Sequence, residues 1–183
     1  GIDVGGTKIA AGLVLFPEGK VRFRRTIPTA TARGGDAVLA DTFRFAQELV
    51  AEAGANGLRV QGIGLGVCEL VDLTGAVVSA NCVAWQGVPV RERFAALAPT
   101  TIEADVRAAA LAEAVLGAGR SSKCFLYVTI GTGISSCLVL DGKPFSGARG
   151  AAGTLASSPL PSPSDIGNSA LAPTLEEIAS GPA

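Results

Sequence analysis

The chain has 183 residues, of which 48% are hydrophobic and 17% charged, and its formal net charge is -1. This composition predicts a close-packed globular protein, and the balanced charge excludes bulk electrostatics as a route to nucleic acid or anionic membranes. No apolar run approaches the ~20 residues needed to span a membrane, and no signal peptide is expected. The four scattered cysteines form no CxxC pair, which is typical of reduced, packed thiols in a cytoplasmic protein.

Apolar periodicity and turn residues predict the following elements in chain order: a β-hairpin over 1–16, a strand over 21–27, a helix capped by Asp36 and running to about Ala53, a strand over 60–67, a short helix over 90–97, a brief strand over 101–103, a helix over 105–116, strands over 124–130 and 134–140, and a final helix opened by a capping box over 174–177. The Ser- and Pro-rich residues 157–173 predict a loop. Strands come first and then alternate with helices, which predicts an α/β fold with a mixed sheet. Trp85 is expected in the core.

A repeated pattern of strand, Gly-rich turn and strand is the strongest signal in the sequence. Glycines let the backbone approach a ligand closely, and successive N–H groups in such turns bind anions. Side-chain hydroxyls and one lysine add phosphate donors. The candidate phosphate-binding residues are Gly5, Gly6, Thr7, Lys8, Gly131, Thr132 and Gly133. Ordinary tight hairpins are the alternative, but two turns of matching design favour a polyphosphate gripped from both sides.

An acidic residue at a strand–helix junction is the next candidate. A carboxylate at the position of Asp105 can accept the proton of a hydroxyl that attacks a γ-phosphate. A helix N-cap is an equally good interpretation of this aspartate from the residues alone.

These motifs together resemble the actin, sugar kinase and heat-shock ATPase superfamily, and most closely the ROK family (repressors, open reading frames and sugar kinases). The similar stretches are Gly1–Leu15, Gly62–Asp72, Ser79–Trp85, Glu103–Gly119, Leu126–Gly142, Gly147–Gly153 and parts of Leu175–Gly181. The resemblance implies a two-lobed ribonuclease H-like (actin-like ATPase) fold with an interlobe cleft. We expect an N-terminal lobe over 1–100 and the start of a second lobe over 101–183, incomplete at its end. No DNA-binding helix-turn-helix precedes the motifs, which favours the kinase branch.

The resemblance also implies site residues, with ATP and Mg²⁺ as cofactors and a sugar as substrate. It makes Asp105 the catalytic base and a sugar contact, and gives Asp3 a water-mediated contact to Mg²⁺. It makes Asn81 and Glu176 sugar contacts, because amide and carboxylate groups bond sugar hydroxyls. The alternatives are a strand-end acid for Asp3, a turn residue for Asn81 and an exposed helical acid for Glu176. The family further implies a homodimer.

Several positions depart from the family pattern. They are Cys68 and Glu69 in place of Pro-Gly, Ala104 and Arg107 in place of two asparagines, Ser135–Cys137 in place of a Gly run, and Thr154–Ser157 in place of a Glu and a zinc-binding His. We therefore expect no structural zinc and a sugar pocket with fewer polar partners. The leading hypothesis is an ATP-dependent kinase of a hexose or N-acetylhexosamine. A non-catalytic regulatory protein that binds sugar or nucleotide is the alternative, followed by an ATPase that serves a partner.

Overall fold

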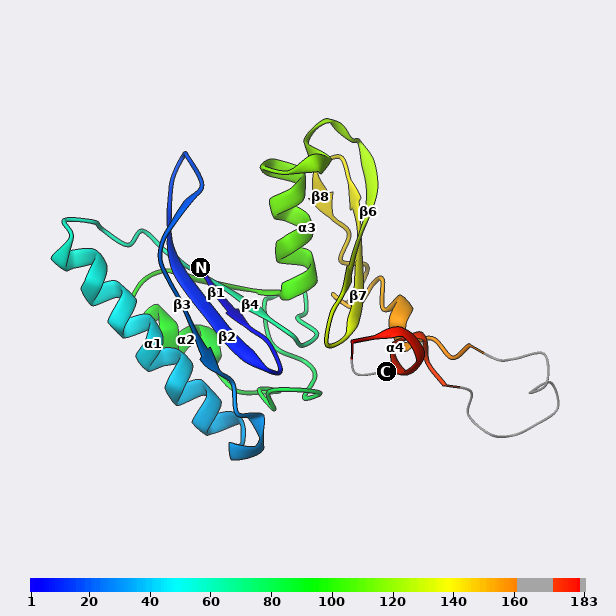
Figure 1. Ribbon diagram of the computed structural model, residues 1–183, viewed down its shortest axis with the longest axis horizontal. Helices are drawn as coiled ribbons and strands as arrows, with labels where there is room; N and C mark the ends of the chain where they lie inside the picture. The colour runs from blue at the N-terminus through cyan, green and yellow to red at the C-terminus, as the bar shows by residue number, and fades with distance from the viewer. Residues whose placement is uncertain (161–172, 182–183) are drawn as a thin grey trace. The chain divides into compact units, whose positions relative to one another are not determined.

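A computed structural model describes residues 1–160 and 173–181 (Figure 1). The chain forms two compact units, 1–108 and 109–183. The strands are β1 (Ile2–Val4), β2 (Lys8–Leu15), β3 (Lys20–Pro28), β4 (Ile63–Val67), β5 (Thr100–Ala104), β6 (Cys124–Ile130), β7 (Ile134–Leu140) and β8 (Lys143–Pro144). The helices are α1 (Gly35–Ala55), α2 (Val90–Ala95), α3 (Asp105–Val115) and α4 (Leu175–Ala179), with short 3-10 turns η1 (Thr31–Arg33), η2 (Ala118–Ser121) and η3 (Leu155–Ser157).

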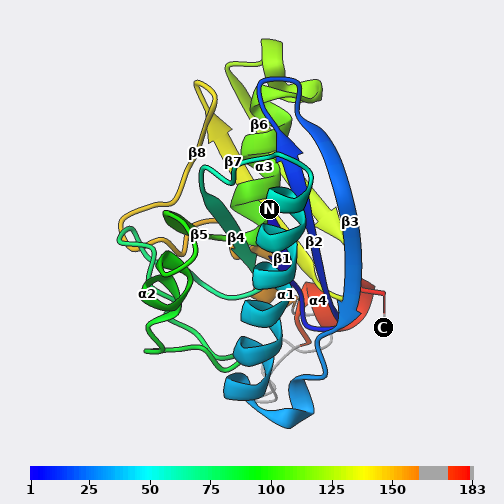
Figure 2. The same cartoon turned by 90° about the vertical axis from the view of Figure 1, so that its left-hand side faces the viewer.

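The first unit is built on a five-stranded mixed sheet in the order β3-β2-β1-β4-β5. The predicted hairpin and the predicted strand after it form an antiparallel meander of β1, β2 and β3, whereas β4 runs parallel to both β1 and β5. Helix α1 lies along one face of the sheet (Figure 2). The parallel strands therefore present their carboxyl ends along one edge of the sheet.

The core of the first unit lies between the sheet and its helices. Alternate residues of β1 and β4 are buried, as expected when one face of each strand packs inward. The rings of Phe43 on α1 and Phe94 on α2 meet edge to face, with centroids 5.4 Å apart. Trp85 is fully buried, which confirms its predicted place in the core, and its Nε1–H donates to the Gly35 carbonyl at 2.9 Å.

The start of α1 differs from the sequence prediction. The N-cap is Gly34, with φ of 89°, so Asp36 lies in the first turn of the helix and does not cap it. A Cβ on Gly35 would lie 2.5 Å from the Ala84 carbonyl oxygen, so the helix begins where only glycine fits. Prediction failed here because this contact joins segments that are distant in sequence. The helix ends at Ala55, two residues beyond the expected end.

Strand β3 forms one outer edge of the five-stranded sheet. Its register with β2 shifts between Ala11 and Leu13, and Phe23 has a positive φ of 53°. Its basic side chains are exposed and comprise Lys20, Arg22, Arg24 and Arg25. Arg25 forms a salt bridge with Glu52 of α1. This edge is both irregular and positively charged.

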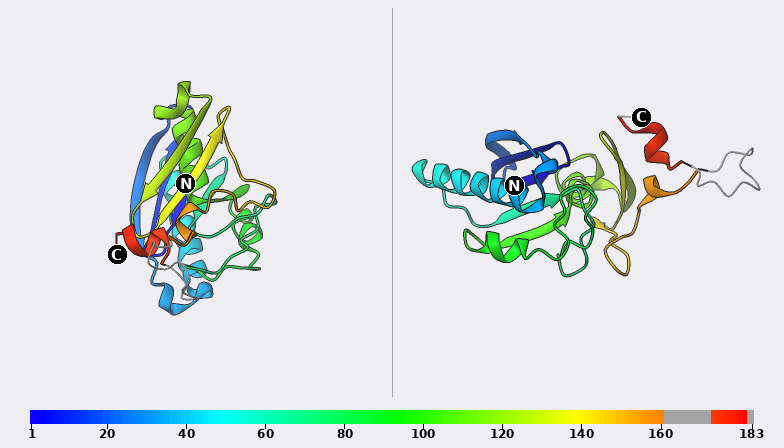
Figure 3. Two further views of the ribbon diagram at one scale, coloured as in Figure 1. Left: turned by 90° about the vertical axis from the view of Figure 1, so that its right-hand side faces the viewer. Right: turned by 90° about the horizontal axis from the view of Figure 1, so that it is seen from below.

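The second unit contains a three-stranded sheet in the order β6-β7-β8 (Figure 3). β6 and β7 form the second predicted hairpin, in which Ile130 pairs with Ile134. Helix α4 lies against β7 and η3. The predicted capping box is confirmed, since the Thr174 N–H donates to Glu177 Oε2 at 2.7 Å and the Glu177 N–H donates to Thr174 Oγ1 at 3.3 Å. Most of the predicted Ser/Pro loop lies outside the described residues.

Within residues 1–160 and 173–181, no helix has the length and apolar character needed to cross a membrane.

Candidate functional site

The carboxyl ends of β1, β4 and β5 carry the chemical groups of the first unit. The Gly-rich turn Gly5–Lys8 follows β1, Glu69 follows β4, and Asp105 follows β5. These ends are close together, because the Cys68 N–H donates to the Val4 carbonyl at 3.1 Å. Ligands of open α/β sheets bind beyond the carboxyl ends of parallel strands. The candidate site of this unit therefore lies at this edge.

Two aspartates of this edge interact electrostatically. Partial burial raises the pKa of Asp3, although the nearby Lys8 ammonium opposes the shift. Burial also raises the pKa of Asp105, and the negative charge of Asp3 raises it further. The Val106 N–H opposes this shift, because it donates a hydrogen bond to Asp105 Oδ1 at 2.6 Å. A bound divalent cation would offset the repulsion between the exposed Asp3 and the half-buried Asp105.

This electrostatic cost predicts a pH-dependent gain in stability for Asp105→Asn. Because the folded-state pKa of Asp105 lies above its usual value of 3.8, the folded protein binds this proton more tightly than the unfolded chain does. The ionised carboxylate therefore destabilises the fold above that pKa, and the penalty disappears as the pH falls toward 3.8. Asparagine keeps the oxygen that accepts from Val106 and carries no charge.

We expect Asp105→Asn to raise the thermal unfolding midpoint at pH 7 by roughly 2–4 °C, which corresponds to about 1 kcal/mol in a chain of this size. The difference should shrink steadily as the pH is lowered to 4. Scanning calorimetry without Mg²⁺ or nucleotide provides the measurement, with Asp141→Asn at an exposed turn as the matched control. A lower midpoint for Asp105→Asn at pH 7 would contradict the expectation.

The first Gly-rich turn is held from both of its ends. The Gly5 N–H donates to the Lys8 carbonyl at 3.0 Å, which closes the turn. Thr29, which is fully buried just after β3, donates through Oγ1 to the Gly5 carbonyl at 2.6 Å, and its N–H donates to the Thr7 carbonyl at 3.0 Å. Thr7 and Lys8 remain exposed. Thr29 was missed by sequence reasoning because a lone threonine after a strand carries no local signal for this contact.

The second Gly-rich turn belongs to the other unit and has its own supports. The Gly131 N–H donates to the Gly133 carbonyl at 2.8 Å, and the Gly181 N–H donates to the Gly131 carbonyl at 2.6 Å. Glu176 Oε2 accepts from the Ile134 N–H at 2.7 Å. Glu176 is thus exposed but contacts the predicted phosphate turn, and its role as a sugar contact stays a prediction. A polyphosphate held between the two turns also stays a prediction.

Asn81 lies on the loop 79–83 of the first unit. Its side chain is exposed, and its amide makes no hydrogen bond to the described part of the chain. Its backbone N–H donates to Glu69 Oε2 at 2.9 Å. The structure therefore fixes the backbone of this residue and leaves the side chain available for a ligand.

The departures next to Asp105 have a structural explanation. Arg107 is buried, and its guanidinium binds Glu103 Oε1 through Nε at 2.7 Å and the Val71 carbonyl through Nη2 at 2.6 Å. Ala104 is buried in β5. These two positions, which hold asparagines in the family pattern, are therefore occupied by a buried apolar residue and a buried, hydrogen-bonded arginine.

Some of the departures in the second unit are buried, whereas Thr154, Leu155 and Ser157 are exposed. Ser136 is buried, and its Oγ donates to the Gly153 carbonyl at 2.7 Å. Thr154 precedes η3, in which Ala156 is buried. Among the residues that the structure describes, no group of three or more His, Cys, Asp or Glu side chains is arranged to hold a metal ion.

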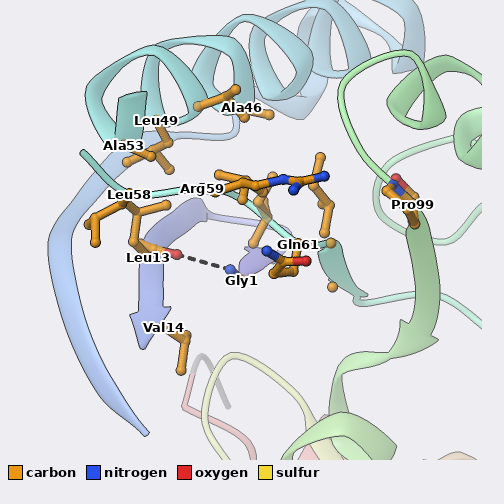
Figure 4. A pocket seen from close by; sticks show the side chains of 18 of the residues that line it. Gly1, Leu13, Val14, Ala46, Leu49, Ala53, Leu58, Arg59, Gln61 and Pro99 are labelled. Carbon is orange, nitrogen blue, oxygen red and sulfur yellow. Dashed lines mark hydrogen bonds between the residues drawn. The ribbon is translucent and has the colours of Figure 1, made fainter. Parts of the chain in front are cut away.

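A cavity of about 830 Å³ lies at the opposite end of the first unit's sheet (Figure 4). Figure 4 shows apolar side chains of α1, such as Leu49 and Ala53, facing it, with Arg59 and Gln61 nearby. Its lining includes the amino ends of β1, β4 and β5 and no sequence-predicted site residue. It is therefore distinct from the edge that carries Asp105.

The family relationship follows from the agreement of these features with known proteins. A model of the ROK family matches residues 1–183. The chain belongs to the ROK family. Its mixed sheet and the solved ROK structures it resembles confirm the predicted ribonuclease H-like, actin-like ATPase fold.

Relatives of this ROK chain include sugar kinases. A glucokinase of Halalkalibacterium halodurans is 28% identical over 158 residues, which cover 85% of this chain and 48% of the glucokinase. An N-acetylgalactosamine kinase of Shewanella sp. (strain ANA-3) is 32% identical over 158 residues, which cover 84% of this chain and 48% of the kinase. The chain thus spans about half the length of these curated relatives.

A solved structure of a ROK family glucokinase also resembles this chain. The ROK family glucokinase from Streptomyces griseus, in complex with glucose and AMPPNP, superposes with a TM-score of 0.76 at 28% identity, covering 88% of this chain and 50% of that chain.

Proposed function

We propose that the protein is an ATP-dependent sugar kinase that transfers the γ-phosphate to a hydroxyl of a hexose or N-acetylhexosamine in the cytoplasm. The observation that carries the proposal is the carboxyl edge of the first unit's sheet, where Asp3 lies in β1, the turn Gly5–Lys8 follows β1 and Asp105 follows β5. The loop bearing Asn81 is hydrogen-bonded to Glu69, which follows β4. The glucokinase and N-acetylgalactosamine kinase relatives support both the reaction and the substrate class.

Asp105 is proposed as the general base. Its Oδ1 accepts from the Val106 N–H, so Oδ2 remains to accept the proton of the attacking hydroxyl. The raised pKa makes this carboxylate a better proton acceptor than an ordinary aspartate. When bound, Mg²⁺-ATP supplies the phosphoryl group and neutralises its developing charge.

The remaining residues bind and orient in this proposal. The backbone of the Gly5–Lys8 turn and the Lys8 ammonium hold phosphate oxygens, as Gly131, Thr132 and Gly133 do from the second turn. Asp3, which is exposed, holds Mg²⁺ through water. The Asn81 amide donates to and accepts from sugar hydroxyls.

A non-catalytic regulatory protein that binds sugar or nucleotide is the second candidate. The specific observation in its favour is that the two asparagine positions of the family pattern hold an apolar residue, Ala104, and an arginine, Arg107, whose buried guanidinium is hydrogen-bonded to Glu103 and the Val71 carbonyl. Buried sugar hydroxyls without partners weaken binding and orientation. Such a protein would bind its ligands without turnover.

ADP release from Mg²⁺-ATP across a panel of hexoses and N-acetylhexosamines separates these two candidates from each other and from the ATPase hypothesis. Release that depends on one sugar supports the kinase. Calorimetric binding of sugar or nucleotide without release favours the regulatory protein, and sugar-independent hydrolysis favours an ATPase that serves a partner. A folded protein with neither binding nor release would contradict all three.

A further inference from the structure

A single buried carboxylate holds the loop 79–83. Glu69, only 4% exposed, follows β4 at the carboxyl edge of the sheet. Its oxygens accept hydrogen bonds from the Ser79 hydroxyl and from the backbone N–H groups of Asn81 at 2.9 Å, Cys82 at 2.5 Å and Val83 at 2.9 Å. Three consecutive backbone donors therefore converge on one side chain.

The hydrogen bonds around Glu69 extend to the neighbouring Leu70. Ser79 Oγ accepts from the Leu70 N–H at 2.8 Å while its hydroxyl donates to Glu69. Burial alone would raise the pKa of Glu69, but the hydrogen bonds from Ser79 and from the three backbone N–H groups outweigh it and lower the pKa below its usual value of 4.5. The carboxylate is therefore ionised throughout the neutral range, and charged acceptors form the stronger class of hydrogen bond.

The anchored loop lies beside the first Gly-rich turn. A Cβ on Gly6 would lie 3.6 Å from Cys82 Sγ, an ordinary van der Waals distance. Asn81, one residue earlier, keeps its side chain exposed. Fixing the backbone at residues 81–83 therefore fixes where Asn81 stands relative to the Gly5–Lys8 turn.

We propose that Glu69 is a positioning residue that fixes the loop 79–83 so that Asn81 is presented to the sugar beside the first phosphate turn. The consequence for the sugar rests on the proposed function, whereas the anchoring of the loop is independent of it. Because Glu69 stands where the family pattern has glycine, this anchor is a property of this chain's own sequence.

Glutamine at position 69 is the most informative replacement. It keeps the shape of glutamate but loses the charge, and its amide NH₂ would face backbone donors. We expect Glu69→Gln to accelerate hydrogen exchange of the amides of residues 81–83 by about 10- to 100-fold, because bonds to a charged acceptor are lost. Exchange in β4 should stay as in the native protein. Glu18→Gln, at an exposed turn, serves as the control, and Glu69→Asp should restore part of the protection.

The effect on the sugar is tested by a double-mutant cycle. Glu69→Gln and Asn81→Ala should each raise the sugar Kd or KM by about 10-fold, and the double variant should lose little more than either single variant, since one residue acts through the other. The kcat should change less than the KM. If Glu69→Gln does not fold, Glu69→Asp takes its place in the cycle.

Each outcome decides one point. Native exchange rates at residues 81–83 in Glu69→Gln would overturn the anchoring. Faster exchange with unchanged sugar affinity, or additive losses in the cycle, would overturn the role in presenting Asn81. A wild-type protein that binds no sugar of the panel would instead contradict the proposed function, and its exchange data would still decide whether Glu69 anchors the loop.

Discussion

Asp105→Asn is expected to lower sugar-dependent phosphoryl transfer by about 10²- to 10⁴-fold, the usual contribution of a general base. Asparagine has the same shape and keeps the oxygen that accepts from the Val106 N–H, but it cannot take the proton of the attacking hydroxyl. The measurement is kcat from coupled ADP release at saturating sugar, together with the sugar Kd from calorimetry. The Kd should change far less than kcat, because the amide still bonds a hydroxyl.

The control for this prediction is Asp141→Asn, which makes the same chemical change in an exposed turn. The wild-type rate should also fall on acidification as Asp105 becomes protonated, beginning above pH 3.8 because its pKa is raised. If Asp105→Asn retains more than half of the wild-type kcat, this aspartate is a helix-end residue and not the base.

Trp85→Ala is expected to lower the free energy of unfolding by about 3–5 kcal/mol, the range for large-to-small changes of buried aromatic residues. The ring is completely buried, and Nε1–H donates to the Gly35 carbonyl, where the start of α1 passes close to Ala84. Removing the ring leaves a cavity under that junction. Urea unfolding followed by circular dichroism measures the loss, since Trp85 is the sole tryptophan and its fluorescence is lost with it.

Two further variants test whether the lost ring volume causes the loss of stability in Trp85→Ala. Trp85→Phe keeps most of the apolar volume but loses the hydrogen bond, so its loss should be clearly smaller than that of Trp85→Ala. Leu73→Ala, at a side chain that is 63% exposed, should change stability by no more than about 0.5 kcal/mol. A loss below about 1 kcal/mol for Trp85→Ala would show that the junction refills the cavity.

Most elements of the fold were predictable because their signals are local. The two hairpins and the capping box depend on apolar alternation, glycine turns and residues three apart, and the structure has them where the sequence predicts. The start of α1 was wrong because a contact between Gly35 and Ala84 decides it. A pattern within one segment contains no information about such a contact.

The residues of the candidate site likewise divide into those that a local sequence pattern predicts and those that it does not. The Gly-rich turns and Asp105 have recognisable patterns, whereas Thr29 and Glu69 act through hydrogen bonds to segments 24 and 10–14 residues away. A usable signal existed for Glu69, because an acid within an apolar stretch after a buried strand requires partners. Arg107, which from sequence is only a lost asparagine, is in the structure a buried partner of Glu103.

The charged outer strand β3 has a consequence for self-association. An unpaired strand edge is a template on which another copy can add its own strand, and this is a common start of aggregation. A second β3 approaching this edge would bring Lys20, Arg22 and Arg24 against the same positive charges, while the shifted register disturbs regular pairing. Sheet extension through β3 is therefore disfavoured most strongly at low ionic strength, where the repulsion is least screened.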